Sequence, residues 1–339
     1  MKGVHVVLLL MIALLAPGIL MSQDAGVVYL EGWPSLRSGG ASRDLDFGLL
    51  VRPGDSVLTG RRDYVELDQA GNSIRINSDT VFTLREIERD GRRETVMTNT
   101  VGSVAYRFQT LAGRRQEVGT ATAVAGVRGT EFTVYAASDG SSLFAVDTGL
   151  VAVESAGVEV EVAAGQAVEV RAGEAPGEVY EWLGRTLDFS DWNTARIEAI
   201  LEDPIESLDR LARRLNQFGI ELEHWNAISQ ELRTQMDIEL EQIRQIRETQ
   251  GEEAYQAYRS EMIRPLQAQQ RTALVNRRYY ALSALSMRRF VLTRMYTTMK
   301  TRYILVPDTP VMREFNDRYT EILNEFEQTF VPELVPADV

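Results

Sequence analysis

Apolar and polar residues alternate along the first half of the chain, which is the periodicity of half-buried β-strands. Short runs of this kind recur at intervals of roughly ten residues, with Gly, Asp and Asn at the turns between them. The predicted strands include Val65/Leu67, Ile74/Ile76, Val151/Val153, Val158/Val160/Val162 and Val168/Val170. An all-β domain is therefore expected over residues 26–173.

Three of these strands follow one another between Gly149 and Val170, which fits either a two-sheet sandwich or a solenoid-like roll. We favour the roll because the strands are short and evenly spaced. Glutamates alternate with the inward valines at Glu154, Glu159, Glu161 and Glu169. A solvated sheet face is the simpler interpretation of these carboxylates, and a cation-binding ladder is the alternative.

Beyond about Glu181 the apolar period changes from about 2 to about 3.6, which predicts helices. Asp203, Pro204 and Glu206 form a helix start with Asp as the N-cap, and Gly219 is expected to end that helix. Further helices are expected over roughly 221–249, over 252–303 with a kink at Pro265, and from Thr309-Pro310 onward.

The fold class is thus α+β and multidomain, with the β part followed by an α-helical bundle or long coiled-coil hairpin over residues 185–339. Residues 174–184 begin where the period changes and are rich in Pro, Gly and charge, so they are predicted to be the linker.

Charge is segregated within the helical half. Residues 262–307 contain no Asp or Glu, whereas residues 221–261 are rich in acid. We expect two antiparallel arms that neutralise each other through Arg–carboxylate pairs. Peripheral membrane contact through the basic segment 262–307, or binding of an anionic envelope polymer, is the alternative. The nine cations of that segment are Arg264, Arg271, Arg277, Arg278, Arg288, Arg289, Arg294, Lys300 and Arg302.

At 339 residues, with 44% hydrophobic and 25% charged residues, the chain is long enough for two domains with separate cores. Residues 1–22 resemble a signal peptide, with Lys2 before the apolar run 6–15 and Pro17-Gly18 after it. A mature N-terminus between residues 19 and 26 and a periplasmic or extracellular location are expected, with an uncleaved membrane anchor as the alternative. The formal net charge of −13 argues against a nucleic-acid partner.

Candidates for catalysis are few. The chain has no cysteine, which excludes disulfides and thiolate chemistry, and His224 is the one histidine beyond the predicted leader. No Gly-x-Ser-x-Gly sequence accompanies it, and residue types for a zinc site are missing, so we expect no enzyme, no cofactor and no metal. A carboxylate glycan hydrolase stays as an alternative, because acidic residues lie close together at Asp44/Asp46, Asp63/Glu66/Asp68 and Asp188/Asp191.

The segment from Thr120 to Val134 has an unusual pattern. Ala121, Ala123, Ala125 and Val127 lie on one strand face, but beyond Glu131 the apolar positions are Phe132, Val134 and Ala136, so the phase has shifted by one residue. Such a shift needs an extra residue, and Gly129 is the expected site of a β-bulge. Arg128 and Glu131 flank it and are expected to pair, so that Arg128, Gly129, Thr130, Glu131 and Phe132 form a structural kink.

This segment resembles the signature strand of the FecR domain family. Further segments resemble family motifs in the right order, and together they cover roughly residues 26–173: Gly48–Gly60, Tyr64–Ile76, Asp79–Leu84, Val101–Val104 and Gly165-Gln166. The resemblance implies an exported β domain that senses or binds, typically in a cell-surface pathway that controls a sigma factor. Because only five residues precede the hydrophobic run of the leader, the cytoplasmic sigma-binding segment of those regulators is not expected here.

Two functions follow as hypotheses. The first is a non-catalytic binding, scaffolding or signal-sensing module of the cell envelope that engages an envelope protein or a glycan. The second is a structural envelope protein that forms homo-oligomers through its helices.

Overall fold

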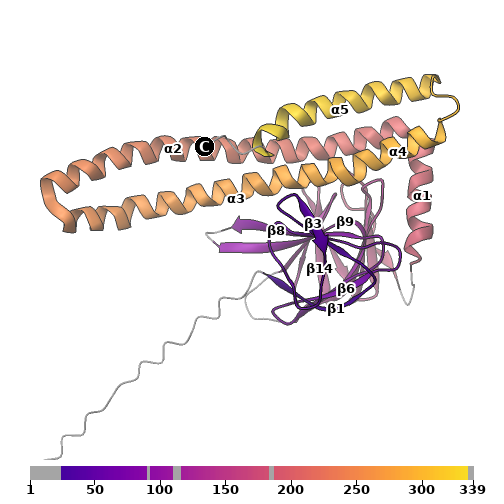
Figure 1. Ribbon diagram of the computed structural model, residues 1–339, viewed down its shortest axis with the longest axis horizontal. Helices are drawn as coiled ribbons and strands as arrows, with labels where there is room; N and C mark the ends of the chain where they lie inside the picture. The colour runs from indigo at the N-terminus through magenta and orange to yellow at the C-terminus, as the bar shows by residue number, and fades with distance from the viewer. Residues whose placement is uncertain (1–23, 90–91, 110–115, 183–186, 335–339) are drawn as a thin grey trace, which may run out of the picture.

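The computed structural model describes residues 24–89, 92–109, 116–182 and 187–334. A strand-rich N-terminal part is followed by long helices that lie along one side of it (Figure 1). This arrangement confirms the predicted order of a β part and an α-helical part. The predicted leader, residues 1–22, lies outside the described residues. A search of the described helices finds none with both the length and the apolar character needed to cross a membrane.

The described strands form two sheets that share the long strand β9 (Arg92–Arg107). Sheet A has the order β4-β1-β6-β7-β9-β12-β13-β16-β17. Sheet B has the order β3-β2-β5-β8-β9-β10-β11-β14-β15. The pairing of β9 with β10 is parallel, and the other pairings of the described strands are antiparallel.

The remaining strands of sheet A are β1 (Ala25–Glu31), β4 (Leu50–Val51), β6 (Tyr64–Gln69), β7 (Asn72–Ile76), β12 (Glu131–Ala136), β13 (Ser142–Thr148), β16 (Gln166–Val170) and β17 (Tyr180–Glu181). Those of sheet B are β2 (Ser35–Ser38), β3 (Ala41–Asp44), β5 (Ser56–Leu58), β8 (Val81–Arg89), β10 (Gln116–Thr120), β11 (Val124–Val127), β14 (Leu150–Ser155) and β15 (Val158–Ala163).

Strand β9 passes from one sheet to the other at Gly102. Its first part pairs with β8 and β10 in sheet B, and its last part, from Gly102 to Arg107, pairs with β12 in sheet A. Gly102 has φ +102°, and a Cβ there would lie 2.5 Å from the Cα of Thr80, so the crossing requires glycine.

One apolar core fills the space between the two sheets. Sheet A contributes Leu67, Ile74, Val104, Phe132 and Phe144, and sheet B contributes Leu36, Phe82, Leu84, Met97, Val127 and Val153. The alternating valines and isoleucines of the sequence point into this core, as their period predicts. The sheets are not closed, and this open two-sheet arrangement does not confirm the roll or solenoid expected from the even strand spacing.

The phase shift of the signature segment coincides with a change of sheet, and the register between β12 and β13 is irregular at Glu131/Phe132 rather than at the predicted position, Gly129. β11 ends at Val127 in sheet B and β12 begins at Glu131 in sheet A, so the chain changes sheets between them. Gly129, with φ +60°, lies in this connection rather than inside a strand. Glu131 does not pair with Arg128 but accepts from Arg107 of β9 at 2.8 Å, because β9 is its strand neighbour.

The helices are α1 (Phe189–Glu202), α2 (Pro204–Tyr258), the π-helical turn η1 (Arg259–Ile263), α3 (Arg264–Ser286), the π-helical turn η2 (Met287–Leu292), α4 (Thr293–Arg302) and α5 (Pro310–Leu334). Helices α2 and α3 form a long antiparallel hairpin, and α5 packs along it near its base (Figure 1). The predicted hairpin is present, whereas a larger bundle is not confirmed.

The predicted start of α2 is confirmed, because Asp203 caps it by accepting from the Glu206 N–H at 3.1 Å. The predicted end at Gly219 is wrong, since α2 continues through it. Gly219 is buried where α5 crosses α2, and a Cβ there would lie 3.5 Å from Thr329 Cγ2. Here glycine serves close helix packing instead of termination. The chain reverses near Gly251, which has φ +84°.

The predicted mutual neutralisation of the two hairpin arms is not found. Among the described residues, no ion pair joins the acidic segment 221–261 to the basic segment 262–307. Arg271 instead lies 3.5 Å from Glu88 of β8, and Arg277 pairs with Glu333 of α5. The basic arm therefore takes its carboxylate partners from the β part and from α5.

Residues 174–184, predicted as a linker, contain strand β17, which pairs with β16 of sheet A. Trp182 follows it and is buried against Leu143, Ala145 and Ala167 on the outer face of that sheet. Part of this segment is therefore continuous with the β part, and α1 begins a few residues later at Phe189.

Candidate functional site

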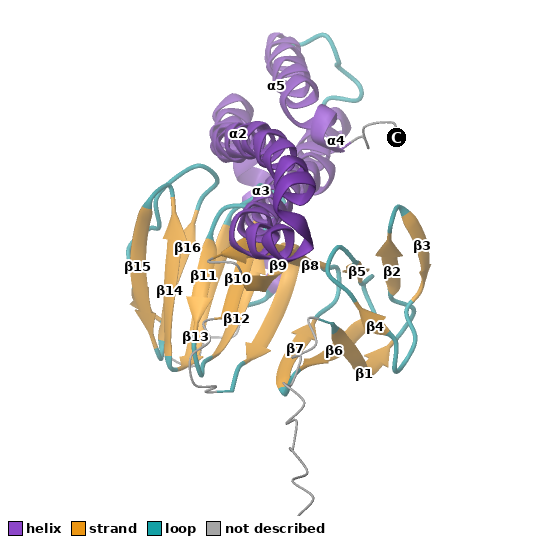
Figure 2. Ribbon diagram, turned by 90° about the vertical axis from the view of Figure 1, so that its left-hand side faces the viewer, coloured by secondary structure: helices purple, strands orange, loops and turns teal. Residues whose placement is uncertain are grey.

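The helical hairpin docks on the outer face of sheet B, where α3 lies against β8 (Figure 2). The Asn276 side chain forms two hydrogen bonds with the backbone of Glu88. Its Oδ1 accepts from the Glu88 N–H and its Nδ2 donates to the Glu88 carbonyl, both at 2.9 Å. Thr272 Oγ1 donates to the Glu88 carboxylate at 2.8 Å. Asn276 is 2% exposed, so these polar groups are withdrawn from water and bind one another. We call this contact the Asn276 latch.

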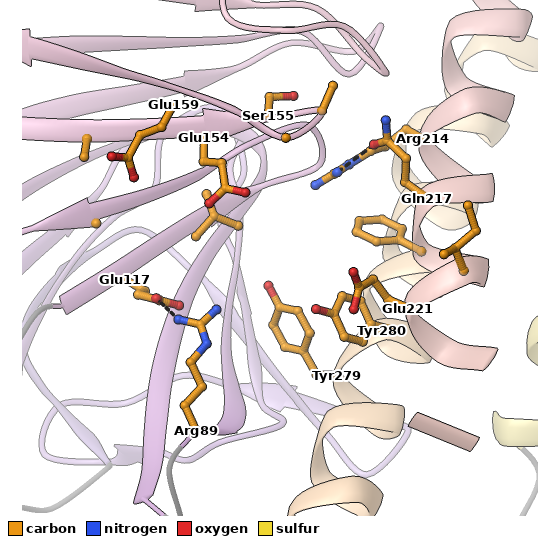
Figure 3. A pocket seen from close by; sticks show the side chains of 17 residues that line it. Arg89, Glu117, Glu154, Ser155, Glu159, Arg214, Gln217, Glu221, Tyr279 and Tyr280 are labelled. Carbon is orange, nitrogen blue, oxygen red and sulfur yellow. Dashed lines mark hydrogen bonds and ion pairs between the residues drawn. The ribbon is translucent and has the colours of Figure 1, made fainter. Parts of the chain in front are cut away.

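Beside the Asn276 latch lies a cavity of about 600 Å³, which we call the interface cavity (Figure 3). Its sheet wall comes from β10, β11, β14, β15 and the end of β8, and its helix wall comes from α2 and α3. The cavity therefore belongs to both parts of the protein. The charged or hydrogen-bonding residues that line it are Arg89, Glu117, Glu154, Ser155, Glu159, Arg214, Gln217, Glu221, Tyr279 and Tyr280.

The two arginines of the interface cavity differ in their partners. Arg89 forms an ion pair with Glu117, so these two charges cancel within the sheet wall. Arg214 forms no ion pair among the described residues. Its Nε donates to the Ala121 carbonyl at 3.0 Å and its Nη1 to Gln217 Oε1 at 2.9 Å, and its guanidinium lies 4.4 Å from the centre of the Phe218 ring.

A second buried guanidinium lies behind Arg214. Arg85 of β8 is 4% exposed; its Nη2 donates to Ser286 Oγ at 2.6 Å, and its Nε has no hydrogen-bond partner within the described part of the chain. Burial lowers the pKa of both Arg85 and Arg214 to about 10, because each charged group has lost water, and at Arg214 the negative field of Glu154 offsets only part of this effect. This end of the cavity is thus positive and undercompensated.

Two tyrosines complete the helix wall. Burial raises the pKa of the Tyr279 hydroxyl, so it stays protonated and can donate a hydrogen bond. It forms no hydrogen bond with any described residue, and Figure 3 shows it pointing into the interface cavity. Burial is the main cause that raises the pKa of the Tyr280 hydroxyl, and the negative charge of Glu221 is the second. The hydroxyl also donates a hydrogen bond to Glu221.

A second candidate surface lies at the free edge of sheet A, along β1 and β4. We call it the aromatic edge and define it by five exposed residues: Val28, Tyr29, Trp33, Phe47 and Leu50. Trp33 is 87% exposed and Phe47 is 74% exposed. Exposing large apolar side chains to water is unfavourable, so these residues form a candidate contact surface.

The loops that carry Trp33 and Phe47 are held in place. Asp63 accepts from the Trp33 N–H at 2.9 Å and from the Gly60 N–H at 2.7 Å. The Leu45 N–H donates to the Pro34 carbonyl at 2.9 Å, which ties the two loops together. The exposed rings are therefore presented on an anchored backbone.

The residues singled out in the sequence are dispersed. Glu154 and Glu159 face each other on β14 and β15 and line the interface cavity, whereas Glu161 lies outside it and Glu169 pairs with Arg196 of α1. No group of three or more His, Cys, Asp or Glu side chains that could hold a metal ion occurs in the described ranges. His224 is exposed on α2, beside Trp225.

The proposed carboxylate pairs have local structural partners. Asp63 anchors the Trp33 loop, Glu66 accepts from Ser73 Oγ at 2.7 Å, and Asp68 accepts from the Gly71 N–H at 3.2 Å. Asp188 caps the N-terminus of α1. These interactions account for the positions of four of the acidic residues without a catalytic role.

Several residues of both surfaces were missed in the sequence. Arg85 occupies an alternating strand position and carries no motif, and Arg214 and Tyr279 become neighbours only because two distant helices meet sheet B. Trp33 had a usable signal, since a tryptophan between Gly32 and Pro34 lies in a turn rather than in a strand.

Comparison with known proteins adds a family match. Residues 55–175 match the family described as FecR protein, which confirms the predicted resemblance to that family, whereas residues 26–54 of the predicted β domain lie outside the match. A comparison with curated proteins gives no match.

Two similar crystal structures are each described as a proposed anti-sigma factor from Parabacteroides distasonis. The first is 16% identical with a TM-score of 0.33 and covers 40% of this chain and 63% of its own. The second is 17% identical with a TM-score of 0.32 and covers 46% of this chain and 73% of its own. At these scores the likeness carries no argument about a partner.

Proposed function

Because residues 55–175 form a FecR domain, we propose that this protein is a non-catalytic sensing and binding module of the cell envelope that engages a protein partner through the aromatic edge. The observation that carries the proposal is the exposure of Trp33, on a loop anchored by Asp63, and of Phe47, on a loop tied to it by the bond from Leu45 N–H to the Pro34 carbonyl. Rigid aromatic side chains supply much contact area at little entropic cost, and they are enriched at the energetic centres of protein interfaces.

The backbone beside these rings also suits a protein partner. β4 pairs with β1 only at Ala25 and Gly26, so the outer side of residues 29–31 has no strand neighbour among the described residues. An extended segment of a partner can add to such an edge through main-chain hydrogen bonds, with the aromatic rings covering its side chains. A protein therefore fits this surface better than a glycan does.

The absence of catalysis and the envelope location are both parts of the proposal. The local roles of Asp63, Glu66, Asp68 and Asp188 support the first. The FecR domain and the leader predicted for residues 1–22 support the second. Mass spectrometry of the protein from an exporting cell is expected to find an N-terminus between residues 19 and 26, and an intact Met1 would contradict it.

The partner surface is tested with a double variant, Trp33→Ala with Phe47→Ala. Both side chains are exposed, so the fold should be retained, as circular dichroism and the Tm can verify. Chemical cross-linking in the envelope fraction should give a defined adduct with the wild-type chain that the double variant loses.

The matched control is Leu305→Ala, which removes another exposed apolar side chain from the connection between α4 and α5. It should keep the adduct. An adduct that survives in the double variant, or one that Leu305→Ala also abolishes, would refute the assignment of the aromatic edge.

A further inference from the structure

We propose that the interface cavity binds a small zwitterion, namely a short peptide with free ends, whose carboxylate contacts Arg214 and Tyr279 and whose ammonium contacts Glu154. Binding here is separate from partner docking at the aromatic edge. The two surfaces lie on different sheets and share no residues.

The negative end of the ligand is assigned by the two undercompensated guanidinium groups. A guanidinium has five N–H donors, and the hydrogen bonds of Arg214 to Ala121 and Gln217 leave part of that set available. Arg85, behind it, adds a second cation with an unpartnered Nε. A buried charge without a counter-charge is costly, so an entering carboxylate would relieve this end of the cavity.

Tyr279 supplies a neutral donor at the same end. A small void next to the cavity is lined by Arg85, Arg214 and Tyr279 together, which places the three side chains around one point. A carboxylate oxygen bound there can accept from the tyrosine hydroxyl and from the guanidinium together. Charge-assisted hydrogen bonds of this kind are stronger than those between neutral groups.

The positive end of the ligand is assigned by the opposite wall. Glu154 forms no ion pair with a described residue, and Figure 3 shows its carboxylate directed into the cavity. Glu159 lies directly across the strand pair from it, so two like charges face each other on β14 and β15. An ammonium group beside Glu154 is favoured, because it would give that carboxylate a charge-assisted hydrogen bond.

The charges together exclude simpler ligands. With Arg89 and Glu117 paired, Arg214 on the helix wall and Glu154 on the sheet wall are lining charges that form no ion pair with a described residue. A polyanion such as a phosphate ester would meet the Glu154 carboxylate, and a plain cation would meet the guanidinium groups. A ligand with one charge of each sign satisfies both walls.

Size and apolar lining favour a short peptide over a single amino acid. The cavity of about 600 Å³ is of the size that holds small organic ligands. Val124, Phe218 and Ile220 also line it, and they would contact short apolar side chains.

The test uses the full chain and three probes in titration calorimetry. L-alanyl-L-alanine carries both charges, its N-acetyl form lacks the ammonium, and its C-terminal amide lacks the carboxylate. The dipeptide is expected to bind, and each capped form is expected to bind at least tenfold more weakly. Absence of dipeptide binding at concentrations on the order of ten millimolar, or equal binding of all three probes, would overturn the proposal.

Variants assign the ends. Glu154→Gln should remove the preference for a free ammonium and keep the preference for a free carboxylate, and Arg214→Gln should do the reverse. Because Arg214 also supports the packing of α2, Tyr279→Phe provides a second test of the carboxylate end, with at least a threefold loss of dipeptide affinity expected.

Glu161→Gln is the matched control, since it removes an exposed glutamate of β15 outside the cavity, and it should leave binding unchanged. An unchanged probe preference in Glu154→Gln would overturn the ammonium assignment. Unchanged binding in both Arg214→Gln and Tyr279→Phe would overturn the carboxylate assignment. Partner capture is measured with the Trp33 and Phe47 variants, so either proposal can fail without the other.

Discussion

The Asn276 latch gives the sharpest prediction about how the two parts of the protein are held together. Asn276→Ala removes the acceptor for the Glu88 N–H and the donor for the Glu88 carbonyl, each at 2.9 Å. Glu88 is 1% exposed, so water cannot replace either bond unless the contact opens.

The magnitude follows from leaving two backbone groups unpaired. Each buried unsatisfied group costs about 1–3 kcal/mol, so the two together should weaken the docking of α3 on β8 by about 2–6 kcal/mol. At about 1.4 kcal/mol for each factor of ten, the equilibrium constant for opening the contact should rise on the order of 30- to 20,000-fold.

Hydrogen exchange read by mass spectrometry measures this opening directly. Peptides from β8 and from the middle of α3 should exchange faster in Asn276→Ala by that factor, whereas peptides from β12 and β13, in the other sheet, should be unchanged. Thr272→Val, which removes one hydrogen bond to the Glu88 side chain, should have a smaller effect.

The matched control is Asn324→Ala, which truncates an exposed asparagine of α5 and should change stability by less than about 0.5 kcal/mol. If Asn276→Ala exchanges like Asn324→Ala, the latch does not hold the hairpin. In that case the docking must depend on other contacts of α3.

Three further predictions concern the fold. Gly219→Ala should fit and raise the free energy of unfolding by roughly 1 kcal/mol through helix propensity. Gly219→Leu should displace α5 and lower that free energy by about 1–3 kcal/mol. Urea unfolding measures both, and equal effects would refute the role of Gly219 in the packing of α5 on α2. Gly149→Ala should lower the stability by about 2–4 kcal/mol, because φ is +86° and the new Cβ would lie 2.7 Å from Thr130 Cγ2. Gly157→Ala, with φ +75° and open space around the new Cβ, should lower it by about 1 kcal/mol. A lower Tm for Gly157→Ala than for Gly149→Ala would contradict this. Burial raises the pKa of Asp139, so the folded state holds this proton more tightly than the unfolded state; the contribution to stability is present below the ordinary aspartate pKa and is lost as the pH rises through the raised folded-state value. Asp139→Asn should therefore flatten the dependence of Tm on pH over the range in which Asp139 titrates. An unchanged slope would show that Asp139 is not the source of that dependence.

Much of the fold was accessible from local pattern, because local pattern is what strands and helix ends depend on. The alternating valines lie in the core between the sheets, and Asp203 caps α2 where its side chain precedes Pro204. The phase shift in the signature segment was detected in the right place. Its cause was missed because a change of sheet and a bulge produce the same shift in the apolar pattern.

The predictions that were wrong share one physical origin. In each case a contact with a residue distant in sequence determines the structure. Gly219 has the usual signal of a helix end, but the packing of α5 overrides it. Glu131 selects Arg107 because β9 and β12 are neighbours in sheet A. Arg271 pairs with Glu88 because α3 docks on β8, and no periodicity within the helices contains that information.

The candidate sites were the least accessible part. Arg85, Arg214 and Tyr279 come from one strand and two helices, and each alone looks like an ordinary residue of an amphipathic element. They acquire a chemical meaning when the docked hairpin removes them from water. Glu154 stays exposed on its sheet face, as the sequence predicts, and it lines the interface cavity only because the hairpin docks opposite it.

The shared strand β9 divides the β part in a way that mirrors the order of synthesis. In both sheets the strands before β9 in the chain lie on one side of it, and the strands after β9 lie on the other. Among the described strands, β9 is therefore the sole main-chain hydrogen-bonded bridge between an early half, which carries the aromatic edge, and a late half, which forms most of the sheet wall of the interface cavity. Within the network of main-chain hydrogen bonds between these strands, a load applied where a partner docks would pass to the late half through one ribbon, with Gly102 as its bend.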